Sequence, residues 1–99
     1  MKKFNDQVVW ITGASSGIGK ALAEECIKEG ATVALSARRL DRLNELKNAL
    51  GEKAFIYPLD VQKKEDVERV AAEIMRDHGQ INVAIANAGF GVIGAFENL

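Results

Sequence analysis

The chain reads Thr12-Gly13-Ala14-Ser15-Ser16-Gly17-Ile18-Gly19 between the apolar run at residues 8–11 and a helical pattern over residues 20–29. A glycine-rich turn between a buried strand and a helix offers unpaired backbone N–H groups and a positive dipole end to an anion. Gly13 allows a sharp exit from the strand, while Gly17 and Gly19 let a pyrophosphate approach without an intervening Cβ. The stretch therefore predicts a nucleotide site.

Two related phosphate motifs do not fit this spacing. A P-loop would need a glycine where Ala14 stands and a hydroxyl where Ala21 stands. A G-x-G-x-x-G fingerprint starting at Gly17 would end on Leu22. The remaining pattern is G-x-x-x-G-x-G, for which an ordinary flexible turn is the alternative that the rest of the chain must exclude.

Size and composition predict one compact unit. The chain has 99 residues, of which 47% are hydrophobic, and a net charge of −1, so no basic bias points to nucleic acid. The single cysteine, Cys26, cannot form an internal disulfide and is expected to pack in the core. No stretch has membrane length, no metal site is predicted, and a soluble, reducing, cytoplasmic setting is expected.

Short strand patterns alternate with helical ones along the whole chain. We expect strands at Val8–Thr12, Thr32–Ser36, 54–59 and 81–87. The intervening segments carry apolar stripes at helical spacing: Ile18, Leu22 and Cys26; Leu43, Leu46 and Leu50; Val67, Val70, Ala71, Ile74, Met75 and His78. Gly30, Gly51 and Gly79 stand where these helices should end.

This alternation requires parallel pairing, with right-handed crossovers that place helices on both faces of one sheet. The fold class is therefore α/β, a doubly wound parallel sheet of Rossmann type. Outward winding from the first strand predicts the order 3-2-1-4, with ligands at the crevice beside the first and fourth strands. The fourth strand would be an open sheet edge, which predicts a homo-oligomer or marginal stability.

The residues after the second strand predict the type of cofactor. A carboxylate would receive the adenosine ribose of NAD, but Ala37 stands there, followed by Arg38 and Arg39. A guanidinium can bind a 2′-phosphate, so NADP is favoured over NAD, with Arg38 as first candidate and Arg39 as second. A pair of solvated arginines is the alternative. Ser15 and Ser36 could add hydroxyl contacts to the same phosphate.

Two further strand ends carry candidate cofactor residues. Asp60 could accept the exocyclic N–H of adenine, with Val61 against the ring, although Asp60 could instead cap the following helix. Asn87, Ala88 and Gly89 could line the ribose, although a plain strand-ending turn would use the same residues.

In order and spacing, these motifs resemble the short-chain dehydrogenase/reductase family, over essentially the whole chain but only the N-terminal half of a member. The resemblance implies that the phosphate turn, with the Ile18 amide, holds the pyrophosphate and that Arg38 holds the 2′-phosphate. It implies cofactor contacts at Gly13, Ser15, Ser16, Gly17, Ile18, Gly19, Arg38, Arg39, Asp60, Val61, Asn87, Ala88 and Gly89. Two positions depart from the family: Ala86 replaces an asparagine, and Gln62 a capping Ser or Thr.

Family chemistry moves a hydride between nicotinamide and a carbonyl or alcohol carbon, using a Tyr-x-x-x-Lys pair and a serine. The only tyrosine, Tyr57, has Val61 four residues later, so no catalytic residue is assigned. Tyr57 and Trp10 are expected in the packing and His78 on the surface at a helix end. We therefore expect residues 1–99 to be a truncated dinucleotide-binding domain that is inactive alone.

Three functions are compatible with these patterns. The first is the cofactor-binding half of an NADP-dependent oxidoreductase. The second is a non-catalytic nucleotide-binding or interaction module that uses its open sheet edge. The third, disfavoured by Ala37, is a protein of the same layered fold that binds another adenine ligand, as some methyltransferases do.

Overall fold

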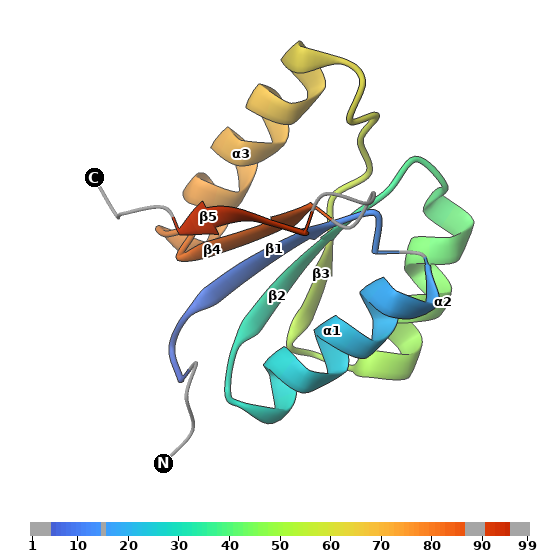
Figure 1. The fold of residues 1–99 in the computed structure, drawn as a ribbon, viewed down its shortest axis with the longest axis vertical. Coiled ribbons are helices and arrows are strands. Elements are labelled where there is room, and N and C mark those ends of the chain that lie inside the picture. Colours follow the sequence, from blue (N-terminus) through green and yellow to red (C-terminus); the bar gives the residue numbers. More distant parts are fainter. Residues whose placement is uncertain (1–4, 15, 87–90, 96–99) are drawn as a thin grey trace.

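The structure is a computed structural model and describes residues 5–14 and 16–86, together with the backbone of residues 91–95. Strands and helices alternate along it (Figure 1). In chain order they are β1 (Val8–Thr12), α1 (Gly17–Lys28), β2 (Thr32–Ser36), α2 (Leu40–Leu50), β3 (Ala54–Ile56), α3 (Lys64–His78), β4 (Val83–Ala86) and β5 (Gly91–Ala95).

The strands form one sheet in the order β3-β2-β1-β4-β5. β1 lies between β2 and β4 and pairs in parallel with both, so that Trp10 is opposite Ala34 on one side and Ala84 on the other. β3 adds to β2, again in parallel. The predicted 3-2-1-4 doubly wound arrangement is therefore confirmed.

Helices cover both faces of the sheet, with α1 and α2 on one face and α3 on the other (Figure 1). Strand alternation divides the side chains between two cores. Val9 and Ile11 of β1 belong to the core under α1 and α2, whereas Val8 and Trp10 belong to the core under α3. The buried indole of Trp10 donates from Nε1 to Ser36 Oγ at 2.9 Å.

The buried stripe of α1 is rotated by one residue from the prediction. Gly19, Ala23 and Cys26 are buried at helical spacing, while Ile18 is 68% exposed. The expectation that Ile18 faces the core is wrong, because the buried stripe passes through the neighbouring Gly19. Leu22 keeps a partly buried place beside the same core.

Strand β3 ends at Ile56, three residues before the predicted limit, but its pairing continues. Tyr57 N–H donates to Leu35 O at 2.8 Å, and Leu59 N–H donates to Ala37 O at 3.0 Å. Pro58 falls between these two donors, where its missing N–H removes no bond to β2. Proline is tolerated at position 58 for this reason.

The expected open edge at β4 is wrong. Residues 91–95 return beside β4 as antiparallel β5, with Val83 opposite Ala95 and Ala86 opposite Gly91. Backbone groups of β4 are thus paired on both sides, with β1 and with β5. The homo-oligomer expected from that edge stays a prediction.

Among the described residues, none of the helices combines the length and the apolar character needed to cross a bilayer.

A matched pair on α3 tests the core beneath that helix. Ile74 is fully buried, whereas its neighbour Met75 is 37% exposed. We expect Ile74→Ala to lower the free energy of unfolding by about 2–5 kcal/mol, because it leaves a cavity. Met75→Ala should change it by less than about 1 kcal/mol. Denaturant unfolding of both variants measures the difference, and equal losses would contradict this packing.

Candidate functional site

The turn after β1 bends back sharply toward α1. Gly13 has φ 70°, a left-handed conformation that favours glycine. The next amide, Ala14 N–H, donates to Ser36 O at 3.1 Å, which ties the turn to the end of β2. The expected role of Gly13 as the exit from the strand therefore agrees with its geometry.

Ser16 caps α1 and links both ends of the turn. Its Oγ accepts from Gly19 N–H at 3.1 Å and donates to Gly13 O at 3.2 Å. Its backbone oxygen accepts from Lys20 N–H at 3.0 Å. The hydroxyl of Ser16 is thus used by the turn itself, as is typical of an N-cap serine.

Two amides in the first turn of α1 are left without acceptors. Gly17 and Ile18 have no backbone N–H hydrogen bond within the described part of the chain, whereas the amide of Gly19 is taken by Ser16. Unpaired N–H groups at a helix start, combined with the helix dipole, attract an anion. The amides of Gly17 and Ile18 can therefore bind an anion at this turn.

The surroundings of Gly17 and Gly19 differ. A Cβ on Gly19 would lie 2.7 Å from Ala14 Cα and 2.8 Å from Ala14 O, so the protein's own backbone requires glycine there. A Cβ on Gly17 would meet nothing within 4 Å, and its φ is not positive. The fold therefore requires glycine at 19 but not at 17, and close approach of a ligand to Gly17 stays a prediction.

The three residues after β2 differ in exposure and pairing. Ala37 is buried and Arg38 is exposed, without an ion pair to any described residue. Arg39 donates to the Asp41 carboxylate from Nη2 at 2.8 Å and from Nε at 3.3 Å. This hydrogen bonding raises the pKa of Arg39 and lowers the pKa of Asp41. Of the two predicted arginines, only Arg38 is unpaired.

Asp60 and Val61 lie at the turn after β3. Asp60 Oδ1 accepts from Gln62 N–H at 3.0 Å, while the Asp60 amide donates to Asp66 Oδ2 at 3.1 Å. The N-cap of α3 is Lys63, so Asp60 does not cap that helix, which removes the alternative interpretation of Asp60, and Gln62 stands before the cap position. Asp60 Oδ2 has no partner among the described residues, and Val61 is 50% exposed.

Ser36 cannot contribute a phosphate contact in this structure. Its side chain is fully buried, and its Oγ accepts from the Trp10 indole. This expectation is wrong because the strand register turns the Ser36 side chain toward Trp10, into the core under α3. The other candidates, Ser15 and Asn87 to Gly89, lie outside the described residues.

Tyr57, just after β3, forms a partly buried contact with His78 at the end of α3. Tyr57 is buried, as expected, and its hydroxyl donates to Asp77 Oδ2 at 2.8 Å and lies 3.0 Å from His78 Nε2. Burial, reinforced by Asp77, raises the pKa of Tyr57, so its hydroxyl stays protonated. His78 also meets the Phe55 ring edge-on at 4.7 Å, so it is a packed residue rather than a bare surface histidine.

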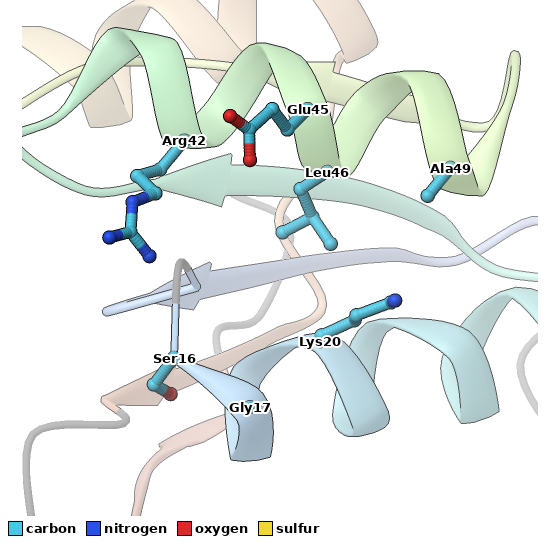
Figure 2. A pocket seen from close by; sticks show the side chains of 7 residues that line it. All are labelled: Ser16, Gly17, Lys20, Arg42, Glu45, Leu46 and Ala49. Atoms are coloured by element: carbon cyan, nitrogen blue, oxygen red, sulfur yellow. The ribbon is translucent and has the colours of Figure 1, made fainter.

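A hollow of about 170 Å³ lies between α1 and α2, beside the phosphate turn (Figure 2). Two exposed cations line it, Lys20 from α1 and Arg42 from α2, and Glu45 is the acid of its lining. Sequence reasoning missed Arg42. The signal was its place in the first turn of the helix that directly follows Arg38 and Arg39.

The two glycines can be compared directly by mutation. Gly19→Ala should lower the free energy of unfolding by roughly 1–3 kcal/mol, because the new methyl overlaps the Ala14 backbone. Gly17→Ala should change it by less than about 1 kcal/mol, since its Cβ enters open space. Thermal unfolding of both variants measures this, and a greater loss for Gly17→Ala would contradict the geometry.

Comparisons with known proteins agree with this architecture. The family model of short chain dehydrogenases matches residues 7–99. The chain is 38% identical over 102 residues to a 3beta-hydroxysteroid dehydrogenase of Mediterraneibacter gnavus, covering all of this chain and 36% of that protein. It is 34% identical over 82 residues to the NADP-dependent 3-hydroxy acid dehydrogenase YdfG of Escherichia coli, covering 83% of this chain and 33% of YdfG.

Solved structures show the same likeness. An NAD⁺-bound xylitol dehydrogenase superposes with a TM-score of 0.84 at 35% sequence identity, over 90% of this chain and 35% of that one. The chain thus spans about a third of the length of the relatives it matches. With the family match over nearly its whole length, the chain belongs to the short chain dehydrogenase family.

Proposed function

We propose that this chain is the dinucleotide-binding part of an NADP-dependent oxidoreductase that acts on a carbonyl or alcohol substrate. One observation carries the proposal: the amides of Gly17 and Ile18 and the guanidinium of Arg38 have no partner among the described residues and lie at the same end of the sheet. Both groups follow parallel strands that end side by side, β1 and β2. A diphosphate with a further phosphate on its adenosine ribose matches these two positively polarised regions.

The residues present fit such a cofactor. The amides of Gly17 and Ile18 would donate to the pyrophosphate, and the bare Cα of Gly17 would permit its close approach. When bound, the nicotinamide supplies hydride transfer. The role of this chain's own residues is to hold and orient the dinucleotide.

Preference for NADP rests on the residues after β2. Ala37 offers no carboxylate to a ribose 2′-hydroxyl, and Arg38 offers a guanidinium that no described acid neutralises. Relatives of both kinds exist, since one is named NADP-dependent and another has a structure with NAD⁺ bound. We therefore assign the choice to this chain's own residues, with Arg38 as the contact to the 2′-phosphate.

The remaining contacts belong to the adenine and ribose. We assign adenine to the exposed side chain of Val61 and to Asp60 Oδ2, which can accept an exocyclic N–H. Asn87, Ala88 and Gly89 are proposed at the ribose and nicotinamide side, and Ser15 at the phosphate turn. Ser16 contributes by shaping the turn through its cap.

We assign proton transfer to none of the described residues. Tyr57 is unsuitable, because its hydroxyl is held by Asp77 and by contact with His78. The alternative of a non-catalytic interaction module depended on an open edge at β4, but β4 is paired on both sides and β5 is the outer strand. The match of residues 7–99 to short chain dehydrogenases favours the oxidoreductase instead. The oxidoreductase is therefore the function that we propose.

The cofactor assignment is tested by reversing one charge. Arg38→Glu should weaken NADP⁺ binding roughly 100-fold, through loss of a charged contact and repulsion of the 2′-phosphate. Binding of NAD⁺, which lacks that phosphate, should change by less than about threefold. Titration with each dinucleotide measures both constants. Equal losses would overturn the NADP assignment.

The phosphate turn is tested independently at Gly17. Gly17→Ala should weaken NADP⁺ and NAD⁺ alike, by roughly tenfold, because the added methyl occupies the approach of the pyrophosphate that both share. Unfolding measurements serve as the control, since the protein has open space at this position. Unchanged affinity for both dinucleotides would place the pyrophosphate elsewhere.

A further inference from the structure

A ribose 2′-phosphate carries about two negative charges at neutral pH, and Arg38 supplies one positive charge. A second cation at the same subsite would balance it. The described residues near the carboxyl ends of β1 and β2 include three candidates, Arg39, Arg42 and Lys20. Their surroundings distinguish them.

Arg39 is the least suited of the three. Its guanidinium forms two hydrogen bonds to Asp41, and both side chains are exposed. An exposed ion pair of this kind is weak and could open. The Asp41 carboxylate, which is hydrogen-bonded to the Arg39 guanidinium itself, would repel a phosphate bound at that guanidinium.

Arg42 has no such partner. It is exposed and forms no ion pair with any described residue. It lines the hollow between α1 and α2 together with Ser16 and Gly17 of the phosphate turn. In Figure 2 its guanidinium extends from α2 toward the turn that carries Ser16. Arg42 thus brings an unpaired charge next to the turn.

Lys20 lines the same hollow but points elsewhere. Figure 2 shows its side chain running along α1 toward Ala49, away from Ser16. Glu45 is the one acid among the residues that line the hollow and is not in ion-pair contact with Arg42. Its negative charge opposes an anion bound beside Arg42.

We infer that Arg42 is a specificity-determining residue, the second guanidinium that recognises the 2′-phosphate together with Arg38, and that Arg39 is not. This inference rests on the proposed function, because it concerns the same dinucleotide. It differs from the sequence-based prediction, in which Arg39 is second. The reason lies in the tertiary structure. Asp41 neutralises Arg39, whereas Arg42 lines the same hollow as Ser16 and Gly17 of the turn after β1.

Three matched substitutions test it, with the dissociation constants of NADP⁺ and NAD⁺ as readouts. Arg42→Gln should lower the preference for NADP⁺ over NAD⁺ about tenfold, because only NADP⁺ carries the phosphate. Arg39→Gln should lower it by less than about threefold. Lys20→Gln removes the same charge and should affect both dinucleotides alike. An unchanged preference in Arg42→Gln, or a larger loss in Arg39→Gln, overturns the inference.

A fourth variant acts in the opposite direction, which misfolding cannot imitate. Glu45→Gln removes the opposing charge and should raise the preference for NADP⁺ about twofold, whereas a fall would overturn the inference. Failure of the proposed function has a separate signature. In that case the parent protein shows no NADP⁺ preference, or Arg38→Glu leaves the preference unchanged. Loss of preference in Arg38→Glu alone would refute Arg42 and keep the function.

Discussion

The contact between the first turn of α1 and the backbone of Ala14 is the constraint on which the site depends. Gly19 packs so closely there that a Cβ would lie 2.7 Å from Ala14 Cα. The Ala14 amide in turn donates to Ser36 O, at the end of β2. These two contacts hold the start of α1 beside the carboxyl ends of β1 and β2. The amides of Gly17 and Ile18, which have no partner among the described residues, consequently lie at the same end of the sheet as Arg38.

Ser36 connects this turn to the opposite face of the sheet. Its backbone oxygen accepts from Ala14, while its side chain accepts from the Trp10 indole in the core under α3. A buried indole N–H without an acceptor would be costly, so the hydroxyl is committed to packing. Ser36 lies at the carboxyl end of β2, where a ligand contact was expected, but its side chain stabilises the fold instead.

The three arginines between β2 and the first turn of α2 show how neighbours decide what a charge can do. Arg38 has no described partner, Arg39 is paired with Asp41, and Arg42 lines the hollow beside the turn. All three are exposed and carry the same guanidinium. What separates them is their partners: Arg39 is already hydrogen-bonded to Asp41, whereas Arg38 and Arg42 form no ion pair with any described residue.

Local sequence pattern and spacing determined the secondary structure and the strand order of this protein. The glycine turn, the alternation of strands and helices and the parallel order 3-2-1-4 followed from the sequence, because period, glycine chemistry and crossover handedness are local or topological rules. Tertiary structure decided the rest. It turned Ile18 outward and Ser36 inward, paired β5 with β4, and brought Arg42 rather than Arg39 to the turn. These outcomes depend on which groups from distant segments meet, and spacing along one chain does not specify that.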